Sequence, residues 1–166
     1  MIQLTPQQIA EYFQRSYTVV DGLWFMKVEG KYGFEAALDI DNEVWKVFPK
    51  IQARLLKSLG KTGDGIDALF ECLTTKLTLE GFKFKAEKTG NKGDFKITIN
   101  ECPWHNLMVK SGREKLSGKV GTLICNTENS AWASEFGLNV RFELGQQICQ
   151  GSKSCILKFK SAKKAP

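Results

Sequence analysis

Residues 82–87, Phe-Lys-Phe-Lys-Ala-Glu, alternate strictly between apolar and charged side chains, and a similar alternation returns in residues 95–100, Phe-Lys-Ile-Thr-Ile-Asn. A period of two is typical of a strand with one buried face and one face in water. Residues 89–93 separate the two runs and include two glycines, which favour a turn. The pattern therefore predicts a β-hairpin in the middle of the chain.

The residues before this hairpin predict helices. Residues 5–8, Thr-Pro-Gln-Gln, have the order of a capping box with proline at the first helical position. Asp21 is expected to cap a short second helix that ends at Gly33. Apolar residues at helical spacing predict a third helix that ends at Gly60 and a fourth that stops near Gly81.

The residues after the hairpin repeat the same kinds of pattern. Residues 106–134 are expected to be helical, with a break near Ser117 and Gly118, and alternation returns in residues 138–144 and 155–159. The sequence thus predicts an α+β fold: N-terminal helices plus a four-stranded antiparallel sheet made of two β-hairpins, with helices packed on it.

The chain of 166 residues is expected to form one domain, 1–166. It comprises a helical part (1–81), a hairpin–helices–hairpin part (82–161) and a basic tail (162–166). Hydrophobic residues make up 42% and charged residues 25%, which is typical of a soluble globular protein. No apolar run approaches the roughly 18 residues of a membrane span, and the N-terminus does not read as a signal peptide. We therefore expect a cytoplasmic protein without a membrane partner.

The net charge of +6 raises the question of nucleic-acid binding. Of the 24 basic residues only four are arginine, the residue that most often makes bidentate contacts with phosphate and guanine. Many of the lysines alternate with apolar residues, as on the solvent face of a sheet. The charge pattern argues against a nucleic-acid partner, whereas a homodimer stays open.

The chain has five cysteines, an odd number, and no sign of secretion. This argues against a disulfide framework and for thiols that are buried, metal-bound or reactive. Cys72 follows Leu69 and precedes Leu73 on an apolar helix face, so we expect it in the core. The other four cysteines are candidates for chemistry.

Cys102 and His105 lie where the first hairpin ends and a helix begins. Cys-x-x-His spacing can place a thiolate and an imidazole on one metal ion, and a helix N-terminus lowers the pKa of a thiol. The alternative is a small buried cysteine and a histidine that hydrogen-bonds locally.

Cys125 and Glu128 are three residues apart on a predicted helix. This spacing places a thiol and a carboxylate on one side of a turn, which suits metal ligation or a nucleophile with its base. Equally, Cys125 could extend the apolar run before it, with Glu128 in solvent.

Cys149 and Cys155 flank the loop of the second hairpin. With a loop of three or five residues they would oppose each other across the strands, close enough to share a metal ion. Cys149 is out of phase with the apolar set of its arm, and a β-bulge near Gly145 would restore the phase.

Four cysteines could thus form one site, with His105 and Glu128 near them. The candidate metal ligands are Cys102, Cys125, Cys149, Cys155 and His105, and the candidate catalytic residues are Cys102, His105 and Glu128. Zinc is the metal that such sulfur and nitrogen ligands favour, and an iron–sulfur cluster is the less favoured alternative. The chain has no pair of Cys-x-x-Cys motifs.

The same cysteine motifs carry a family resemblance. Residues 20–29, 101–105, 125–128 and 148–155 resemble the L-2-amino-thiazoline-4-carboxylic acid hydrolase-like family over nearly the whole chain. This resemblance implies an α+β domain with a pocket between sheet and helices. The activity named for the family opens a cyclic thiazoline by attack of water on a C=N carbon, for which a metal-bound hydroxide or an activated thiolate would serve. Cys102 or Cys125 would then be nucleophile or ligand, and Glu128 or His105 the proton carrier.

The last third of the chain is more distantly similar to small-molecule-binding domains of the 4-vinyl-reductase type, some of which hold zinc with three cysteines and a glutamate. Position by position, the thiolates fall on Cys125, Cys149 and Cys155. The glutamate expected three residues before Cys149 is Gln146 here. The residues that could replace this glutamate are Glu128, Glu143, Cys102 and His105. The resemblances together suggest a small-molecule-binding protein with a cysteine-rich metal site or, alternatively, a hydrolase.

Overall fold

The computed structural model describes residues 2–90 and 93–161. The basic tail predicted for residues 162–166 lies outside the described residues, as do residues 91 and 92 of the hairpin turn. The chain divides into two compact units, residues 1–41 and residues 42–166. Each unit is described by itself.

The first unit contains helix α1 (Pro6–Tyr32) and the beginning of helix α2 (Phe34–Gly60). The predicted capping box is confirmed, since the Thr5 hydroxyl accepts from the Gln8 N–H and the Gln8 side chain accepts from the Thr5 N–H. The predicted helix start at Asp21 is wrong, because α1 continues through this residue without interruption. Its predicted end is confirmed: Gly33 adopts a φ of 86°, which ends the helix.

The second unit holds the rest of α2 and three more helices, α3 (Ile66–Leu79), α4 (Pro103–Lys110) and α5 (Glu114–Ser134). The break predicted near Ser117 and Gly118 is wrong, because α5 passes through both residues. The chain instead turns between α4 and α5, where Gly112 has a φ of 71° that few other residues adopt.

Strands β1 (Lys83–Lys88), β2 (Phe95–Glu101), β3 (Val140–Leu144) and β4 (Cys155–Ser161) form one antiparallel sheet in the order β1-β2-β4-β3. The predicted α+β class and the sheet of two hairpins are therefore confirmed. The two hairpins join through their second strands, with Phe95 opposite Phe159 and Ile99 opposite Cys155. This register places the start of β4 beside the end of β2.

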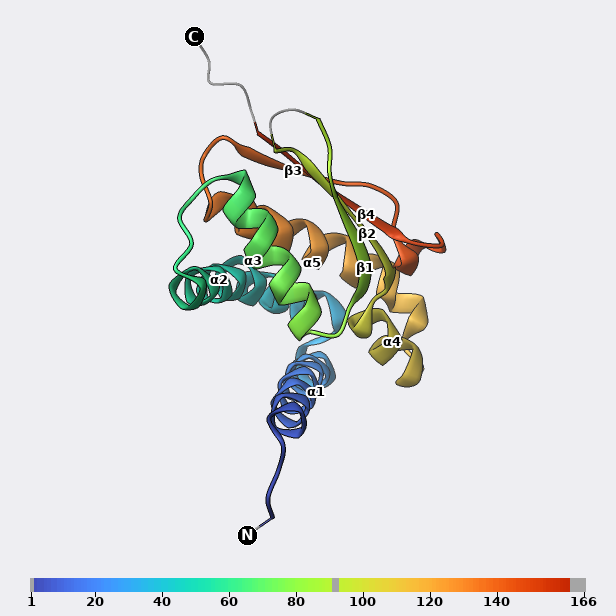
Figure 1. Ribbon diagram of the computed structural model, residues 1–166. Helices are drawn as coiled ribbons and strands as arrows, with labels where there is room; N and C mark the ends of the chain where they lie inside the picture. The colour runs from blue at the N-terminus through green and yellow to red at the C-terminus, as the bar shows by residue number, and fades with distance from the viewer. Residues whose placement is uncertain (1, 91–92, 162–166) are drawn as a thin grey trace. The chain divides into compact units, whose positions relative to one another are not determined.

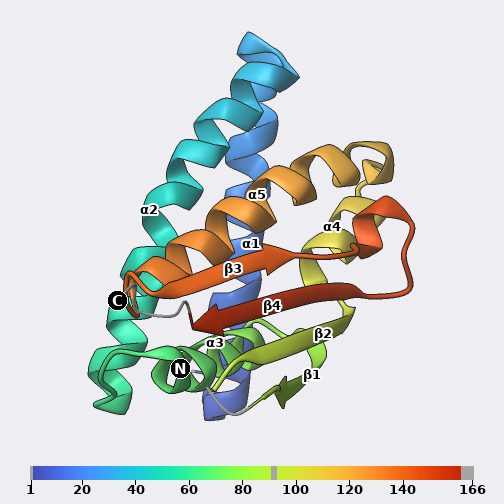
Figure 2. The ribbon, with the colours of Figure 1, turned by 90° about the horizontal axis from the view of Figure 1, so that it is seen from above.

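Helices α3 and α5 cover one face of the sheet (Figure 1, Figure 2). Alternate residues of the strands point into this layer, and the core of the unit forms there. Its largest fully buried side chains include Leu69, Leu73, Phe95, Ile97, Trp132, Phe136 and Phe159. Each such side chain contributes roughly 1.5–3 kcal/mol by its removal from water.

The other face of the sheet is charged, as the alternation predicted. Lysines there pair with glutamates on neighbouring strands: Lys96 Nζ lies 3.0 Å from Glu87, and Lys160 Nζ lies 2.9 Å from Glu143. Lysines of this sheet face are thus paired in solvent.

None of the helices within the described ranges is both long enough and apolar enough to span a bilayer.

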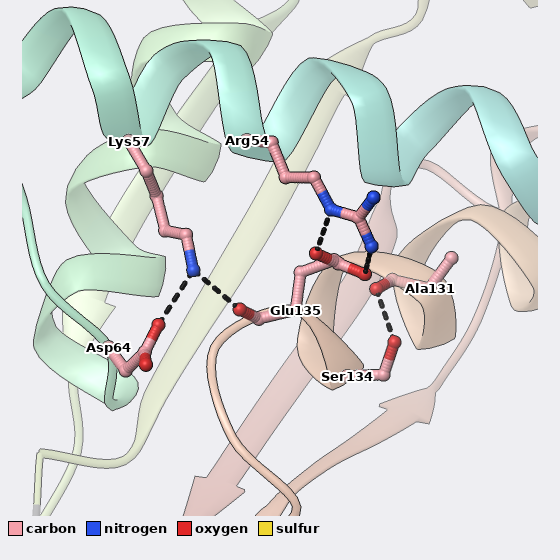
Figure 3. A network of polar contacts seen from close by, with 6 residues as sticks. All are labelled: Arg54, Lys57, Asp64, Ala131, Ser134 and Glu135. Atoms are coloured by element: carbon pink, nitrogen blue, oxygen red, sulfur yellow. Dashed lines mark hydrogen bonds and ion pairs between the residues drawn. The ribbon is translucent and has the colours of Figure 1, made fainter.

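Polar contacts tie α2 to the end of α5 (Figure 3). The Arg54 guanidinium donates from Nε and Nη2 to the two carboxylate oxygens of Glu135, at 2.7 and 2.9 Å. Lys57 Nζ donates to the Glu135 carbonyl at 2.9 Å and to Asp64 at 2.6 Å. The Ser134 hydroxyl donates to the Ala131 carbonyl and closes the last turn of α5. These bonds fix one end of the helix that carries Cys125.

Candidate functional site

The four candidate cysteines come from four different elements of the second unit. Cys102 caps the N-terminus of α4, Cys125 lies in the middle of α5, Cys149 lies in a short 3-10 turn, η1 (Ile148–Gln150), and Cys155 begins β4. All are free thiols; Cys155 is buried, and the other three are half-buried. The thiols of Cys102, Cys149 and Cys155 each contribute to the raised pKa of Cys125, so the four cysteines lie in the same region of the second unit. A ligand set formed by these four thiols stays a prediction.

Two glycines of α5 allow η1 to approach this helix. A Cβ atom on Gly121 would lie 2.7 Å from the Cys149 Sγ, and one on Gly118 would lie 3.1 Å from the Cys149 carbonyl oxygen. The first distance is closer than a carbon contact allows and the second is tight, so a larger residue at Gly121 would displace the Cys149 thiol and one at Gly118 would press on η1. Cys125 follows Gly121 by four residues and lies on the same side of the helix. Gly121 thus brings Cys149 to the face that carries Cys125.

Polar contacts hold η1 in this place. The side chain of Gln147 is buried, accepts from the Thr122 hydroxyl at 3.0 Å and donates to the Gly121 carbonyl at 3.4 Å. Gln150 donates to the same hydroxyl at 2.8 Å. The contacts anchor both ends of η1 on α5.

The predicted pairing of Cys149 with Cys155 across the strands is wrong. The irregularity expected near Gly145 is present: the Gly145 N–H donates to the Ile156 carbonyl at 2.8 Å, whereas the Ile156 N–H donates to the Gln146 carbonyl at 3.0 Å, so two residues oppose one as in a β-bulge. Beyond Gln146 the chain leaves the sheet, and η1 places Cys149 against α5 instead of opposite Cys155. The link to Cys155 is instead a backbone one, since the Ile148 N–H donates to the Cys155 Sγ at 3.2 Å.

The N-terminus of α4 presents backbone N–H groups to Cys102. The N–H groups of His105 and Trp104 both favour the thiolate form of this residue. The influence of His105 on the pKa of Cys102 thus comes from its backbone N–H, whereas the sequence suggested its imidazole. The His105 Nδ1 atom is buried and has no hydrogen-bond partner among the residues described. The Trp104 ring packs edge-on against Trp45 of α2, with 5.7 Å between centroids.

The thiols are protonated at neutral pH. Burial raises the pKa of Cys102 to about 11, against an ordinary value of 9.0, and the N–H groups offset only part of this rise. Burial raises the pKa of Cys125 well above its usual range, and the neighbouring Glu128 adds to the rise. Burial also raises the pKa values of Cys149 and Cys155. The thiolate fraction that a cysteine nucleophile needs is therefore small in the metal-free chain.

The family model described as a family of unknown function (DUF6125) matches residues 5–116. This match covers more than half of the chain. The chain belongs to the DUF6125 family. The match includes Cys102 and His105 but ends before Cys125, Cys149 and Cys155. No curated protein matches this chain.

In this DUF6125 protein, Glu128 is not in solvent but belongs to a buried ion triad. The Lys76 ammonium bonds to the Glu128 carboxylate, and its Nζ lies 2.9 Å from Glu80 Oε2. Gln52 donates to the other Glu80 oxygen at 3.0 Å. Burial alone would lower the pKa of Lys76, but the two carboxylates outweigh burial and raise it. Burial raises the pKa of Glu128, and Lys76 offsets only part of this rise.

Sequence reasoning missed Lys76 and Glu80, although a signal was present. Lys76 follows Cys72 by four residues and Leu73 by three, so it falls on the apolar face of α3 where a lysine needs a buried partner. The Glu128 charge raises the pKa of both Cys102 and Cys125, so the triad acts electrostatically on the region of the cysteines.

Position 146, where the resemblance expects a metal-binding glutamate, and the candidate replacement Glu143 both lie on the surface. Glu143 is exposed and pairs with Lys158 and Lys160, on the charged face of the sheet. Gln146 is also exposed and donates to the Ser154 hydroxyl at 3.1 Å. Of the acidic residues named as replacements, only Glu128 lies near the cysteines.

The side chains of this region do not form a ready metal site. Within residues 2–90 and 93–161, no three Cys, His, Asp or Glu side chains stand close enough together to hold one. The chemistry of the thiols suits zinc, and a cysteine side chain moves its sulfur by rotation about a single bond. Metal binding at this place would therefore require side-chain rotations.

Proposed function

We propose that this protein is a cytoplasmic small-molecule-binding protein whose cysteines Cys102, Cys125, Cys149 and Cys155 bind a zinc ion. The observation that carries the proposal is that Cys102, Cys149 and Cys155, from three different elements, all lie near enough to Cys125 of α5 to raise its pKa, and that none of the four is exposed. Buried free cysteines are common singly, but their gathering is typical of thiolate metal sites.

Backbone groups around the thiols support the proposal. The Ile148 N–H donates to the Cys155 sulfur, and the α4 amides favour the Cys102 thiolate. N–H groups directed at sulfur stabilise thiolates and tune metal–thiolate centres. The raised pKa values are those of the metal-free state, and a bound cation deprotonates a coordinating thiol. Zinc held by four thiolates supplies structural stability, whereas a site with an open position supplies a Lewis acid.

The hydrolase suggested by the resemblance receives less support. Direct attack by a cysteine needs a thiolate near neutral pH, and burial raises the pKa of each candidate thiol. Glu128 is committed to Lys76 by an ion pair, which limits it as a proton carrier. The reduced cysteines suit the cytoplasm, where thiols persist.

The test is the zinc content of the full chain purified under reducing conditions, measured for the wild type and for Cys149→Ser and Cys155→Ser. We expect about one zinc per wild-type chain and a large loss in both variants. Cys72→Ser is the matched control, because Cys72 is buried in the core and its thiol lies 3.4 Å from the Thr62 hydroxyl. Cobalt substitution reports thiolate ligation independently through its visible spectrum. A wild-type chain that neither retains zinc nor takes up cobalt overturns the proposal, as does equal zinc retention in all three variants.

A further inference from the structure

Helix α2 has a second apolar face within the second unit. Trp45, Pro49 and Ala53 are buried on one side of the helix. The side chains of Val44, Val47, Ile51, Leu55 and Leu59 repeat every three or four residues, about a third of a turn away. Each of these five residues is between 50% and 71% exposed. We call these five residues the α2 stripe.

The α2 stripe is unusual for a surface. Single exposed apolar residues are normal, but a continuous apolar row is typical of a helix that packs against a partner. The charged residues of this part of the helix, Glu43, Lys46, Lys50, Arg54 and Lys57, avoid the row. The sequence therefore keeps this face apolar, although nothing in the second unit buries it.

We propose that the α2 stripe binds the same stripe of a second copy of this chain, with the two helices antiparallel around a two-fold axis. Under this symmetry, Val44 faces Leu55 of the second copy, and Val47 faces Ile51 of the second copy. Apolar residues thus meet apolar residues at these four positions of the stripe, as an isologous interface requires, and Leu59 lies at the end of the contact. Rows spaced by three and four residues pack at the shallow crossing angle of helix bundles. The inference is independent of the proposed metal site.

The charges beside the stripe fit the same arrangement. Glu43 and Arg54 lie on one edge of the stripe, and the two-fold axis brings Glu43 of each copy to the level of Arg54 in the other. Arg54 is 67% exposed and uses only two of its three nitrogens on Glu135. The third nitrogen, Nη1, is turned away from Glu135 (Figure 3). It can donate to a second carboxylate. In the dimer this carboxylate is Glu43 of the other copy, and the two-fold axis makes the contact twice.

The apolar row alone is too narrow for a stable interface, so the residues on its edge have to contribute to the contact. A stable interface buries about 800 Å² on each partner. The apolar row is narrow, so the flanking side chains of Glu43, Lys50 and Arg54 have to join it along the length of the helix. The resulting contact has an apolar centre and a charged rim, which is the usual anatomy of such interfaces.

The experiment measures the mass of the full chain in solution by light scattering and sedimentation over a wide range of concentrations. We expect a dimer for the wild type. Ile51→Glu places a carboxylate at the centre of the contact and should weaken dimerisation roughly a hundredfold. Leu79→Glu is the matched control, because Leu79 is 62% exposed at the end of α3 and should leave the dimer intact. Circular dichroism verifies that each variant is folded.

A charge-exchange pair tests the register. Val47→Lys and Ile51→Glu should each favour the monomer, whereas the double variant should recover dimer, because each new lysine faces a new glutamate of the other copy. A chain that is monomeric at all concentrations overturns the proposal. So does a dimer that Ile51→Glu leaves intact, or a folded double variant that is no more dimeric than the single ones.

Discussion

The Cys149 Sγ lies 2.7 Å from the position that a Cβ atom would take on Gly121. The thiol therefore rests on the bare backbone of α5, in a space that only glycine leaves open. Cys125 lies one turn further along the same helix. This relationship between a glycine and a cysteine, 28 residues apart in the sequence, decides whether Cys149 can join the other thiols.

Gly121→Ala should weaken zinc binding with little effect on the fold. The new methyl group meets the end of a side chain that can rotate away, and alanine favours helix by about 0.5–1 kcal/mol. The rotated Cys149 thiol would leave the cluster, and we expect zinc affinity to fall about tenfold or more, which is roughly 1.4 kcal/mol. Competition with a chromophoric chelator measures the affinity.

Gly30→Ala is the control for this substitution. Gly30 also lies inside a helix, and a Cβ atom there meets nothing within 4 Å. The variant should gain the same helix propensity and bind zinc as the wild type does. Equal zinc affinity in Gly121→Ala and Gly30→Ala would remove Gly121 from any role in positioning Cys149.

Lys76→Met should destabilise the protein severely. The substitution keeps the length of the side chain but leaves the Glu80 and Glu128 carboxylates buried without their shared ammonium. Loss of one partner from a buried ion pair costs roughly 3–5 kcal/mol. Urea denaturation followed by circular dichroism measures the free energy of unfolding.

Two further variants separate this cost from a general effect of losing a lysine. Lys46→Met removes a lysine whose ion pair with Glu43 is exposed, so its effect should be much smaller. Lys76→Met combined with Glu80→Gln and Glu128→Gln removes the buried charges together and should recover part of the lost stability. If the triple variant were less stable than Lys76→Met alone, the explanation by unpaired charge would be wrong.

The sequence pattern predicts the individual helices and strands of this fold better than it predicts which of them pack against one another. Alternation identified all four strands, and the Thr5 capping box identified the start of α1. The pairing of β2 with β4 depends on how the two hairpins pack, which no local period encodes. The pattern predicts a helix break at Gly118, because a local pattern does not distinguish a glycine that ends a helix from one that allows a neighbouring segment to approach.

The same limit applies to the candidate site. The sequence named the four cysteines and Glu128, since thiols and carboxylates are recognisable as residue types. It placed Cys149 opposite Cys155, because a hairpin was assumed to continue to its loop. The turn η1 replaces that part of the hairpin. The position of Lys76 on an apolar helix face was a readable sign of a buried ion pair, but its partners Glu80 and Glu128 depend on the packing of α3 against α5.

Gln147→Ala should loosen η1 without disturbing the sheet. The buried Gln147 side chain links the turn to Thr122 and to the Gly121 carbonyl. Its loss removes two hydrogen bonds, each contributing about 0.5–1.5 kcal/mol, while the Thr122 hydroxyl keeps its bonds to the Gly118 carbonyl and to Gln150. Hydrogen exchange should quicken at residues 147–151, while the amides of β2 and β4 keep their protection. Unchanged exchange in the turn would show that other contacts hold it.

The metal-free protein should lose stability in mild alkali. The folded-state pKa of Cys102 is about 11, against 9.0 for an ordinary thiol, so the unfolded chain releases its proton first as the pH rises. The stabilisation is complete below about pH 9 and is lost as the pH rises through about 11. The raised pKa values of Cys125, Cys149 and Cys155 add in the same direction. Urea denaturation at about pH 8 and pH 10 measures the change. Cys102→Ala should reduce this pH dependence, whereas Cys72→Ala, outside the cluster, should retain it; equal pH dependence in both variants would contradict the assignment to Cys102.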